Sequence, residues 1–468
     1  MIEGAEVPAS QSDLGSDVAS SIPREWEMRR LRTITSIPIR NGLGESARTY
    51  QPDWPRYIRI TDIDGPRSLK SAGVASLPPD VASCSMVGDG DLLLAAVGAT
   101  VGKSYLHRRS GVPACFAGYL VRLALKAEAL PEYVSYWTES DHYWLQVETS
   151  AVKATIENLS ASRYRRFVIP LPPPEVQAAV VRYLDHIDSR IQRFIAAKER
   201  LIELLEEEKR AIIHRAVTRG LDPDAPLRHS GIDAIGRMPA HWQVKPLQQV
   251  TEPKRPIMYG IVLPGPDVDE GVYIVKGGNC EPGRLRPELL SKTTHEIESR
   301  YARSRLREND IVIAIRGGVG ASELVPQDLI GANLTQDAAR IAPKAGVSPR
   351  WLLNALREHG TREQIVARVR GATVRGINIR DLKRIPLPVP PREEQVTIAG
   401  YLERELHAVG QVEGRASAHL RLIREYRTRL VSDVVTGKLD VRAAARHLPA
   451  DPEIDVPELD EELEEAVA

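Results

Sequence analysis

The chain has 468 residues, with 63 Lys and Arg and 63 Asp and Glu, so its formal net charge is zero. A content of 42% hydrophobic and 27% charged residues excludes a wholly disordered chain, and this length predicts two or three domains. The sequence has no run of about 18 apolar residues, so no membrane span is expected. Its three separated cysteines, Cys84, Cys115 and Cys280, exclude a disulfide framework and suit a reducing cytoplasm.

Charge is distributed unevenly along the chain. Residues 451–468 contain nine acidic residues and the first twenty contain four, and neither segment contains Lys or Arg. The intervening residues 21–450 therefore carry a net charge of +13. Blocks of like charge pack poorly, so we expect an acidic disordered leader at 1–21 and an acidic disordered tail at 441–468. A basic body permits nucleic-acid binding, although a positive excess spread over a surface explains it equally well.

Residues 22–170 form a first globular segment of mixed type. Apolar runs bounded by Gly, Pro and Asp predict strands at 57–60, 91–97 and 119–125. The segment 131–149 is predicted to be helical. We therefore expect an α+β fold in which sheet content leads.

A glycine-rich segment at 98–104 follows the second of these strands and imitates a phosphate-binding loop. Three residues separate Gly98 from Gly102, whereas that loop needs four to place its amides around the phosphates. The corresponding segment of the second half, 317–322, contains no lysine. Both segments therefore predict tight turns after a strand.

His107, Arg108 and Arg109 form the densest basic cluster of the first globular segment. They lie in a predicted loop, where phosphate contact and a solvated surface turn are about equally expected. The weaker counterparts in the second half are Lys276, Arg284 and Arg286. The eleven histidines show no metal-binding spacing, so no metal site is expected.

Residues 174–220 predict one long helix, since acidic residues and proline suit its first turn and Gly220 stands where a C-terminal cap belongs. Apolar residues recur in this helix in steps of four and three, as a coiled-coil seam requires. They are Val180, Leu184, Ile187, Ile191, Phe194, Leu201, Leu205 and Ile212.

The same order of segments recurs after a linker at 222–237. A second globular segment, 238–388, has predicted strands at 273–275 and 310–315 and a predicted helix at 349–369. A second long helix follows at 392–437, although three glycines lower its propensity. Its seam residues are Ile398, Leu402, Val409, Ile423 and Leu430.

Two helices of this length most economically pack on each other, antiparallel and around a pseudo-two-fold axis. The alternative is that each helix covers its own globular segment.

The recurrence is an internal duplication. Residues 169–177 match 387–395 at an offset of 218, and the same register pairs Asp222 with Asp440. At the front of each copy a Pro-x-x-Trp sequence ends at Trp26 and Trp242. A period this long indicates duplicated domains rather than a solenoid.

These features together resemble the specificity subunit of a type I restriction–modification system over residues 22–440. They are the Pro-x-x-Trp start, the strand leading to a glycine turn, and the Pro-Leu-Pro-Pro-x-x-x-Gln segment at 170–177 that opens a long helix, all given twice. The second copy departs from the first at Arg392, which takes the place of Pro174.

The resemblance implies two target-recognition domains, 22–170 and 238–388, each of which reads one half of a split DNA site. It implies that two helical spacers, 171–221 and 389–440, separate and join these domains and bind two methyltransferase subunits. The chain would then be non-catalytic, and its partners would be double-stranded DNA, the methyltransferase subunits and, in systems that cleave, restriction subunits. S-adenosylmethionine, ATP and magnesium would belong to those partners.

Candidate DNA-contacting residues are basic side chains in the loops of the two globular segments. They are Arg59, Lys103, His107, Arg108, Arg109, Lys276, Arg284, Arg286 and Arg316. Two other functions stay open at this point. One is a coiled-coil scaffold that binds only proteins, and the other is a nucleotide-dependent DNA-processing enzyme that uses 98–104.

Overall fold

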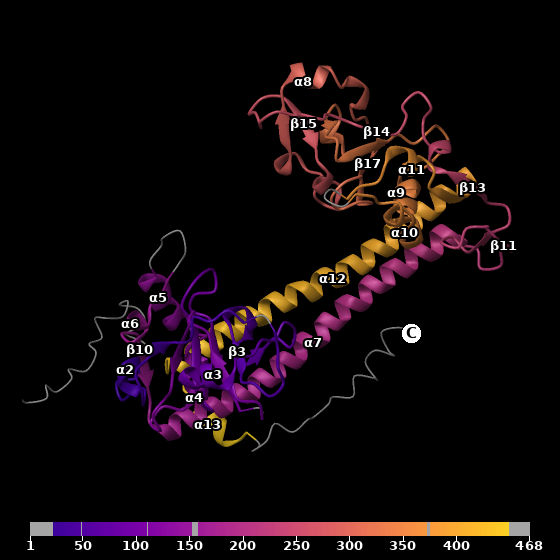
Figure 1. The fold of residues 1–468 in the computed structure, drawn as a ribbon. Helices are drawn as coiled ribbons and strands as arrows, with labels where there is room; N and C mark the ends of the chain where they lie inside the picture. The colour runs from indigo at the N-terminus through magenta and orange to yellow at the C-terminus, as the bar shows by residue number, and fades with distance from the viewer. Residues whose placement is uncertain (1–21, 48, 110, 152–157, 372–374, 449–468) are drawn as a thin grey trace, which may run out of the picture. The chain divides into compact units, whose positions relative to one another are not determined.

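The computed structural model describes residues 22–47, 49–109, 111–151, 158–371 and 375–448. The chain divides into two compact units, Met1–Lys198 with Ala418–Ala468 (unit 1) and Glu199–Ser417 (unit 2). Both boundaries fall inside long helices, α7 (Pro174–Arg219) and α12 (Arg392–Val435). Each unit therefore contains one globular segment and a part of each helix (Figure 1).

The sheet of unit 1 has four antiparallel strands in the order β2-β9-β6-β7. They are β2 (Arg40–Asn41), β9 (Leu120–Leu123), β6 (Leu92–Ala95) and β7 (Ser104–Leu106). A separate parallel pair joins β3 (Arg56–Ile58) to β8 (Ala114–Phe116).

The sheet of unit 2 repeats this order as β14-β20-β17-β18. Its strands are β14 (Met258–Tyr259), β20 (Ala338–Ile341), β17 (Ile311–Ala314) and β18 (Ser322–Leu324). Again a parallel pair accompanies it, formed by β15 (Val272–Val275) and β19 (Asn333–Leu334), with β16 (Ser291–Thr293) beside β15. The expected α+β duplication is confirmed at the level of strand order.

Strand β6 in unit 1 and its equivalent β17 in unit 2 are buried on both faces of their sheets, which explains their unbroken apolar sequences. Side chains alternate along a strand. Accordingly, Leu92 and Leu94 enter the cluster that includes the long helices, while Leu93 and Ala95 enter a second cluster on the other face. In unit 2 the residues of β17 divide in the same way.

Short helices cover the sheet face that is turned to the long helices (Figure 1). The segments 131–149 and 349–369 are helical, as predicted, and each consists of two helices. The breaks occur where the side chains of Ser140 and Glu358 accept hydrogen bonds from backbone N–H groups and so start a new helix. The four helices are α4 (Pro131–Trp137), α5 (Asp141–Ser150), α9 (Pro349–Arg357) and α10 (His359–Ala367).

Smaller elements complete both units. The two-stranded pairs are β1 (Glu27–Arg30) with β10 (Val168–Leu171), β4 (Ile63–Gly65) with β5 (Ser68–Leu69), β11 (Leu227–His229) with β12 (Arg237–Pro239), and β13 (Gln243–Pro246) with β21 (Pro386–Val389). The short helices are α2 (Leu31–Ile34), α3 (Pro79–Ala82), α6 (Ala161–Tyr164), α8 (His295–Ser299), α11 (Ile379–Lys383) and α13 (Arg442–Arg446).

Two of these elements lie where no regular structure was expected. The first strand of the β11–β12 hairpin falls in the predicted linker, and α13 falls in the predicted acidic tail. Helix α13 forms because Val441 and Ala445 are buried, which gives this stretch an apolar anchor. The rest of the predicted leader and tail, 1–21 and 449–468, lies outside the described residues.

The two long helices are present and continuous, as predicted, and they pack together within each unit. Both helices are followed by a glycine with a left-handed backbone, Gly220 (φ 75°) and Gly437 (φ 74°). A Cβ on Gly220 would lie 3.1 Å from the Trp242 ring, and one on Gly437 would meet Pro23 and Trp26. The Pro-x-x-Trp sequences therefore serve to close over the ends of these helices.

The antiparallel pairing follows from contacts inside each unit. In unit 1 the N-terminal part of α7 meets the C-terminal part of α12, where Asp188 pairs with Arg427. In unit 2 the C-terminal part of α7 meets the N-terminal part of α12, where Lys209 pairs with Glu413. Lys209 therefore supplies a charged contact between the two helices.

The predicted seam is largely buried. Val180, Leu184, Ile191, Ile398, Leu402 and Leu430 are buried, and Ile187, Leu201, Leu205, Ile212, Val409 and Ile423 are half-buried. Phe194 is a wrong prediction, because its side chain is 41% exposed and Ile195 is buried instead. The seam takes a step of four at Ile191–Ile195, since a helix of 3.6 residues per turn drifts from a strict heptad.

One motif residue has a clear structural role. The buried side chain of Gln177 accepts a hydrogen bond from the Leu130 N–H (2.8 Å) and donates to the Pro172 and Glu128 carbonyl oxygens. Its counterpart Gln395 accepts from the Ser348 N–H (2.9 Å). In each unit this amide fastens the loop before a short helix to the start of a long helix.

We predict that Gln177→Ala lowers the free energy of unfolding by about 2 kcal/mol, because it leaves buried backbone groups without partners. Chemical denaturation of the full chain measures this change. The matched control is Gln411→Ala, since Gln411 is exposed on α12 and its side chain bonds to the neighbouring His407 on the same helix. Equal losses in the two variants would contradict the assigned role.

Burial also predicts a pH dependence. His142 is 1% exposed, its Nδ1 accepts a hydrogen bond from the Trp137 indole N–H (2.9 Å), and burial lowers its pKa to about 4. In the unfolded chain its pKa is about 6.5, so acid stabilises the unfolded state as the pH falls from 7 toward 4. This residue alone should remove about 2 kcal/mol of stability between pH 7 and pH 5.

The measurement compares unfolding free energies of the wild type and of His142→Gln at both pH values. The glutamine carbonyl can still accept from the indole, so the variant should lack this part of the loss. Parallel pH profiles would show that His142 does not titrate as described.

Candidate nucleic-acid interface

The turn that follows β6 lies at one end of the unit 1 sheet, together with two other loops. The Ala96 N–H donates to the Tyr119 carbonyl (2.9 Å), and the Gly42 N–H donates to the Leu120 carbonyl (3.2 Å). We call this the glycine-turn end of the sheet, defined in unit 1 by residues 41–43, 96–103 and 117–119.

The glycine-turn end recurs in unit 2, where residues 259–261, 315–321 and 335–337 define it. The Ile315 N–H donates to the Asp337 carbonyl (2.9 Å), and the Gly260 N–H donates to the Thr335 carbonyl (3.3 Å). A Cβ on Gly260 would clash with the Leu334 carbonyl oxygen, and one on Gly42 would clash with that of Phe116. Only glycine permits this close approach of strands in either copy.

The glycine segment at 98–104 is a hairpin turn and not a phosphate-binding loop. It leads from β6 directly back into the antiparallel strand β7, so no helix follows it. Gly98 (φ 82°) and Gly102 (φ 88°) supply the left-handed conformations of this turn. The Gly317–Gly320 turn between β17 and β18 has the same form.

Two of the predicted contact residues lie at the glycine-turn end. Lys103 is exposed beside the turn of unit 1. Arg316 is 43% exposed at the end of β17, with its guanidinium 3.7 Å from the Asp337 carboxylate. Both cations can therefore reach an anionic ligand that approaches this end.

The structure places His107, Arg108 and Arg109 at the opposite end of β7, and the first two are poor candidates for phosphate contact. His107 is buried, and burial lowers its pKa, so its ring is held uncharged. Arg108 pairs with Asp89 (3.4 Å) and Glu132, while Arg109 is exposed and its backbone N–H donates to Asp89 (2.8 Å). The number of basic residues in this stretch of sequence does not reveal the acidic residues that the fold places beside them.

Arg59 and Lys276 start equivalent 3₁₀ turns, at Ile60–Asp62 and Gly277–Cys280. The Arg59 guanidinium donates to both carboxylate oxygens of Asp62 (2.8 and 3.1 Å), and the Lys276 ammonium donates to Ser291 (2.8 Å). Both side chains thus support their own loops.

Arg284 and Arg286 lie on the surface segment after the second of these turns. Both are exposed, and Arg284 has only a 3.9 Å approach to Glu281. They remain available to a ligand, and the Glu281 carboxylate that Arg284 approaches lies beside Gly318 of the glycine-turn end.

Sequence reasoning missed two arginines near Arg316. The backbone of Arg370 pairs with that of Gly376, which in turn pairs with Arg316, so Arg370 and Arg375 belong to the same loop cluster. Both side chains are exposed. Their signal in the sequence was the change from helical periodicity to an Arg- and Gly-containing loop after Val369.

Exposed tyrosines accompany these cations. Tyr119 is 65% exposed in unit 1 and Tyr259 is 47% exposed in unit 2, each at its glycine-turn end. They occupy non-equivalent positions, Tyr119 in the turn before β9 and Tyr259 at the end of β14, and the 218-residue offset pairs Tyr119 with Asp337 and Tyr259 with Asn41. The two ends thus share a backbone frame and differ in their exposed side chains.

No cluster of three or more His, Cys, Asp or Glu side chains suited to a metal ion occurs among the described residues. Nor is any helix in this part of the chain long and apolar enough to cross a membrane.

Comparisons with known proteins agree with this architecture. Residues 266–407 match the family model of the type I restriction modification DNA specificity domain. The chain is 26% identical over 324 residues to the Escherichia coli type I restriction enzyme EcoBI specificity subunit, a match that spans 68% of this chain and 66% of that protein. It is 24% identical over 435 residues to the putative type I restriction enzyme MjaX specificity subunit of Methanocaldococcus jannaschii, covering 90% of this chain and 95% of that one.

A similar fold occurs in a solved structure that describes complex assembly and conformational transition of the type I restriction–modification system. The TM-score is 0.68 at 17% identity, with 89% of this chain and 99% of that chain covered. By the family model, these relatives, the duplicated sheet order and the paired long helices, the chain is similar to the DNA specificity subunits of type I restriction–modification systems.

Proposed function

We propose that this chain reads a bipartite DNA target, with residues 22–170 as one target-recognition domain and 238–388 as the other. The observation that carries the proposal is the repeated glycine-turn end, which presents one backbone frame twice with different exposed side chains. Two different surfaces on one frame suit two different half-sites, so the target should be non-palindromic.

DNA binding would combine two kinds of contact. Lys103 in unit 1 and Arg316, Arg370 and Arg375 in unit 2 would neutralise phosphates and supply salt-dependent affinity. Polar loop side chains and the exposed tyrosines Tyr119 and Tyr259 would meet base edges in the grooves. The paired cations Arg59 and Arg108 would contribute less, because they already have carboxylate partners.

In this proposal the chain has no reaction of its own. It holds DNA so that a partner methyltransferase subunit can flip an adenine out of the duplex and methylate it. The spacers 171–221 and 389–440 would set the distance between the half-sites and dock two methyltransferase subunits. S-adenosylmethionine, ATP and magnesium would bind to methyltransferase and restriction subunits, and the complex would work in the cytoplasm.

Replacing residues 22–170 by the corresponding domain of a related subunit should change one half of the modified sequence and leave the other half intact. The measurement is sequencing of modified bases in DNA from cells that express the hybrid with its methyltransferase. The reciprocal replacement of 238–388 should change the other half. If either hybrid changed both halves, the assignment of one domain to one half-site would fall.

Removing two cations of the glycine-turn end, as Arg316→Ala with Arg370→Ala, should weaken DNA binding and flatten its salt dependence. Each lost phosphate contact lowers the slope of log affinity against log salt by about 0.9. Gel shifts or fluorescence anisotropy at several salt concentrations measure both quantities.

The matched control is Arg300→Ala, since Arg300 is exposed at the end of α8 and pairs with the exposed Glu296 (2.7 Å). It should change neither quantity. Unchanged affinity in the double variant would move the interface away from this end. Failure of the wild type to bind any DNA at low salt would favour a scaffold that binds only proteins.

A further inference from the structure

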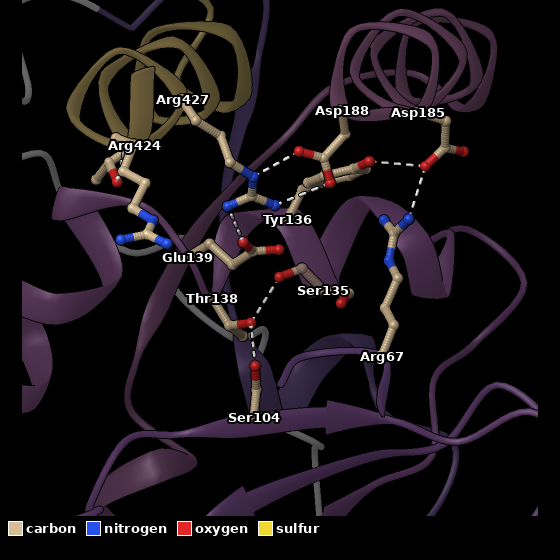
Figure 2. Close-up of polar contacts among 11 residues, drawn as sticks. Arg67, Ser104, Ser135, Tyr136, Thr138, Glu139, Asp185, Asp188, Arg424 and Arg427 are labelled. Atoms are coloured by element: carbon tan, nitrogen blue, oxygen red, sulfur yellow. Dashed lines mark hydrogen bonds and ion pairs between the residues drawn. The ribbon is translucent and has the colours of Figure 1, made fainter. Parts of the chain in front are cut away.

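A half-buried polar cluster joins the two long helices in unit 1 (Figure 2). The Arg427 guanidinium of α12 donates to both carboxylate oxygens of Asp188 on α7, at 2.5 and 3.0 Å. Its remaining nitrogen donates to Glu139, between α4 and α5, at 2.7 Å. Every nitrogen of this guanidinium is therefore used inside the unit.

The cluster is shielded from solvent and supported by its neighbours. The side chains of Arg427, Asp188 and Glu139 are 21%, 22% and 13% exposed. Burial raises the pKa of Glu139, and Arg427 opposes this effect. One turn away, Asp185 accepts hydrogen bonds from Tyr136 (2.7 Å) and Arg67 (2.6 Å), which holds α7 against α4 (Figure 2).

The second copy does not offer the same partners. The offset of 218 pairs Asp188 with Leu406 and Glu139 with Arg357. The offset is structurally valid here, because α4 and α9 begin at Pro131 and Pro349, and Gln177 and Gln395 make the same bond. Unit 2 therefore has an apolar residue and a cation where unit 1 has two carboxylates.

Side chains in unit 2 are arranged accordingly. Arg357 turns to the Ser322 carbonyl oxygen (2.8 Å) and to Glu323 (3.0 Å). Lys209, which occupies the position equivalent to Arg427, pairs with Glu206 (3.1 Å) and Glu413 on the helices themselves. A cation is present in both copies, but only the first copy provides carboxylates on its globular segment and on α7 at the equivalent positions.

A coiled-coil seam of aliphatic residues alone allows several partners and registers. Polar residues at the seam select one partner and one register. If the C-terminal part of α12 packed on the second copy of another chain, Arg427 would face Leu406 and Arg357. That contact would bury a cation against an apolar side chain and a like charge.

We propose that Arg427 is a positioning residue that selects the first-copy surface, Asp188 with Glu139, as the partner of the C-terminal part of α12. It thereby disfavours pairing of α12 with the second copy of another chain. Lys209 is the equivalent residue of α7 and carries the same positive charge. The proposed selection of a partner surface therefore applies to the pairing of α12 and not to the pairing of α7. This role goes beyond DNA recognition, and it is tested without DNA.

A selective role and a merely stabilising role predict opposite results. An apolar replacement of a buried ion pair often keeps stability, because desolvation offsets much of the attraction, while it removes the selectivity. The full-length variant Arg427→Met, Asp188→Leu, Glu139→Met should keep its melting temperature within a few degrees. After refolding over a range of concentrations, it should form several-fold more dimers and larger species than the wild type, as measured by light scattering.

The matched control is Arg200→Met with Glu203→Leu, an exposed pair on α7 that should refold like the wild type. An apolar variant with the wild-type size distribution at every concentration would overturn the proposal. So would a variant that loses many degrees of melting temperature and stays monomeric, since that is the result of a stabilising pair alone.

Charge reversal provides a second test if the apolar variant does not fold. Arg427→Glu alone should raise the oligomeric fraction and lower the melting temperature, and adding Asp188→Arg with Glu139→Lys should restore both toward the wild type. Failure of the reversed set to recover either quantity would also overturn the proposal. Because both tests follow refolding and size, a failure here leaves the proposed DNA recognition unaffected.

Discussion

Burial of the aliphatic strips of α7 and α12 is the interaction on which both units depend. A helix of more than forty residues with polar flanks gains little from propensity alone, so its strip must be covered. In unit 1 the cover comes from the inner face of the sheet and from the other helix, since Val180 and Leu184 share one cluster with Leu430. The Tyr133 hydroxyl fixes this arrangement by donating to the carbonyl oxygens of Pro170 and Val435 (2.7 and 3.0 Å).

Each unit is consequently built from both copies of the duplication. In unit 1 the end of α12 closes at Gly437 against Pro23 and Trp26 of the first copy, and in unit 2 the end of α7 closes at Gly220 against Trp242 of the second. Polar contacts follow the same plan, because His214 of α7 bonds to the buried Glu358 that caps α10 (2.9 Å). A single copy therefore lacks the long-helix segment against which its own unit packs.

The sequence predicted those features that repeat or have long periodicity. The duplicated order, the continuous helices and the glycine turns were predicted from the spacing of residues along the chain. The structure contains all three, because each depends on the backbone conformation that those residues require. Local packing was less accessible: Phe194 was placed in a seam that drifts to Ile195, and the sequence did not reveal that the Ser140 cap starts a second helix. The surroundings of the candidate cations could not be predicted from the sequence, because the fold buries His107 and pairs Arg108 with Asp89 and Glu132, which lie about twenty residues away along the chain. Arg370 and Arg375 became candidates only when strand pairing placed their loop beside Arg316.

The residues that hold the fold together and the exposed residues that are proposed to contact DNA lie in different parts of each unit. Gln177, Gln395 and the Arg427 cluster are buried or half-buried between helices, where a substitution changes stability or pairing. Tyr119, Tyr259 and Arg316 are exposed at turns whose backbone path is fixed by glycines and strand bonds. Surface substitutions at such positions usually alter stability by less than about 0.5 kcal/mol. The glycine-turn end can therefore change the side chains that it presents while the sheet, the short helices and the paired long helices keep their packing, which is the property that the proposed reading of two half-sites requires.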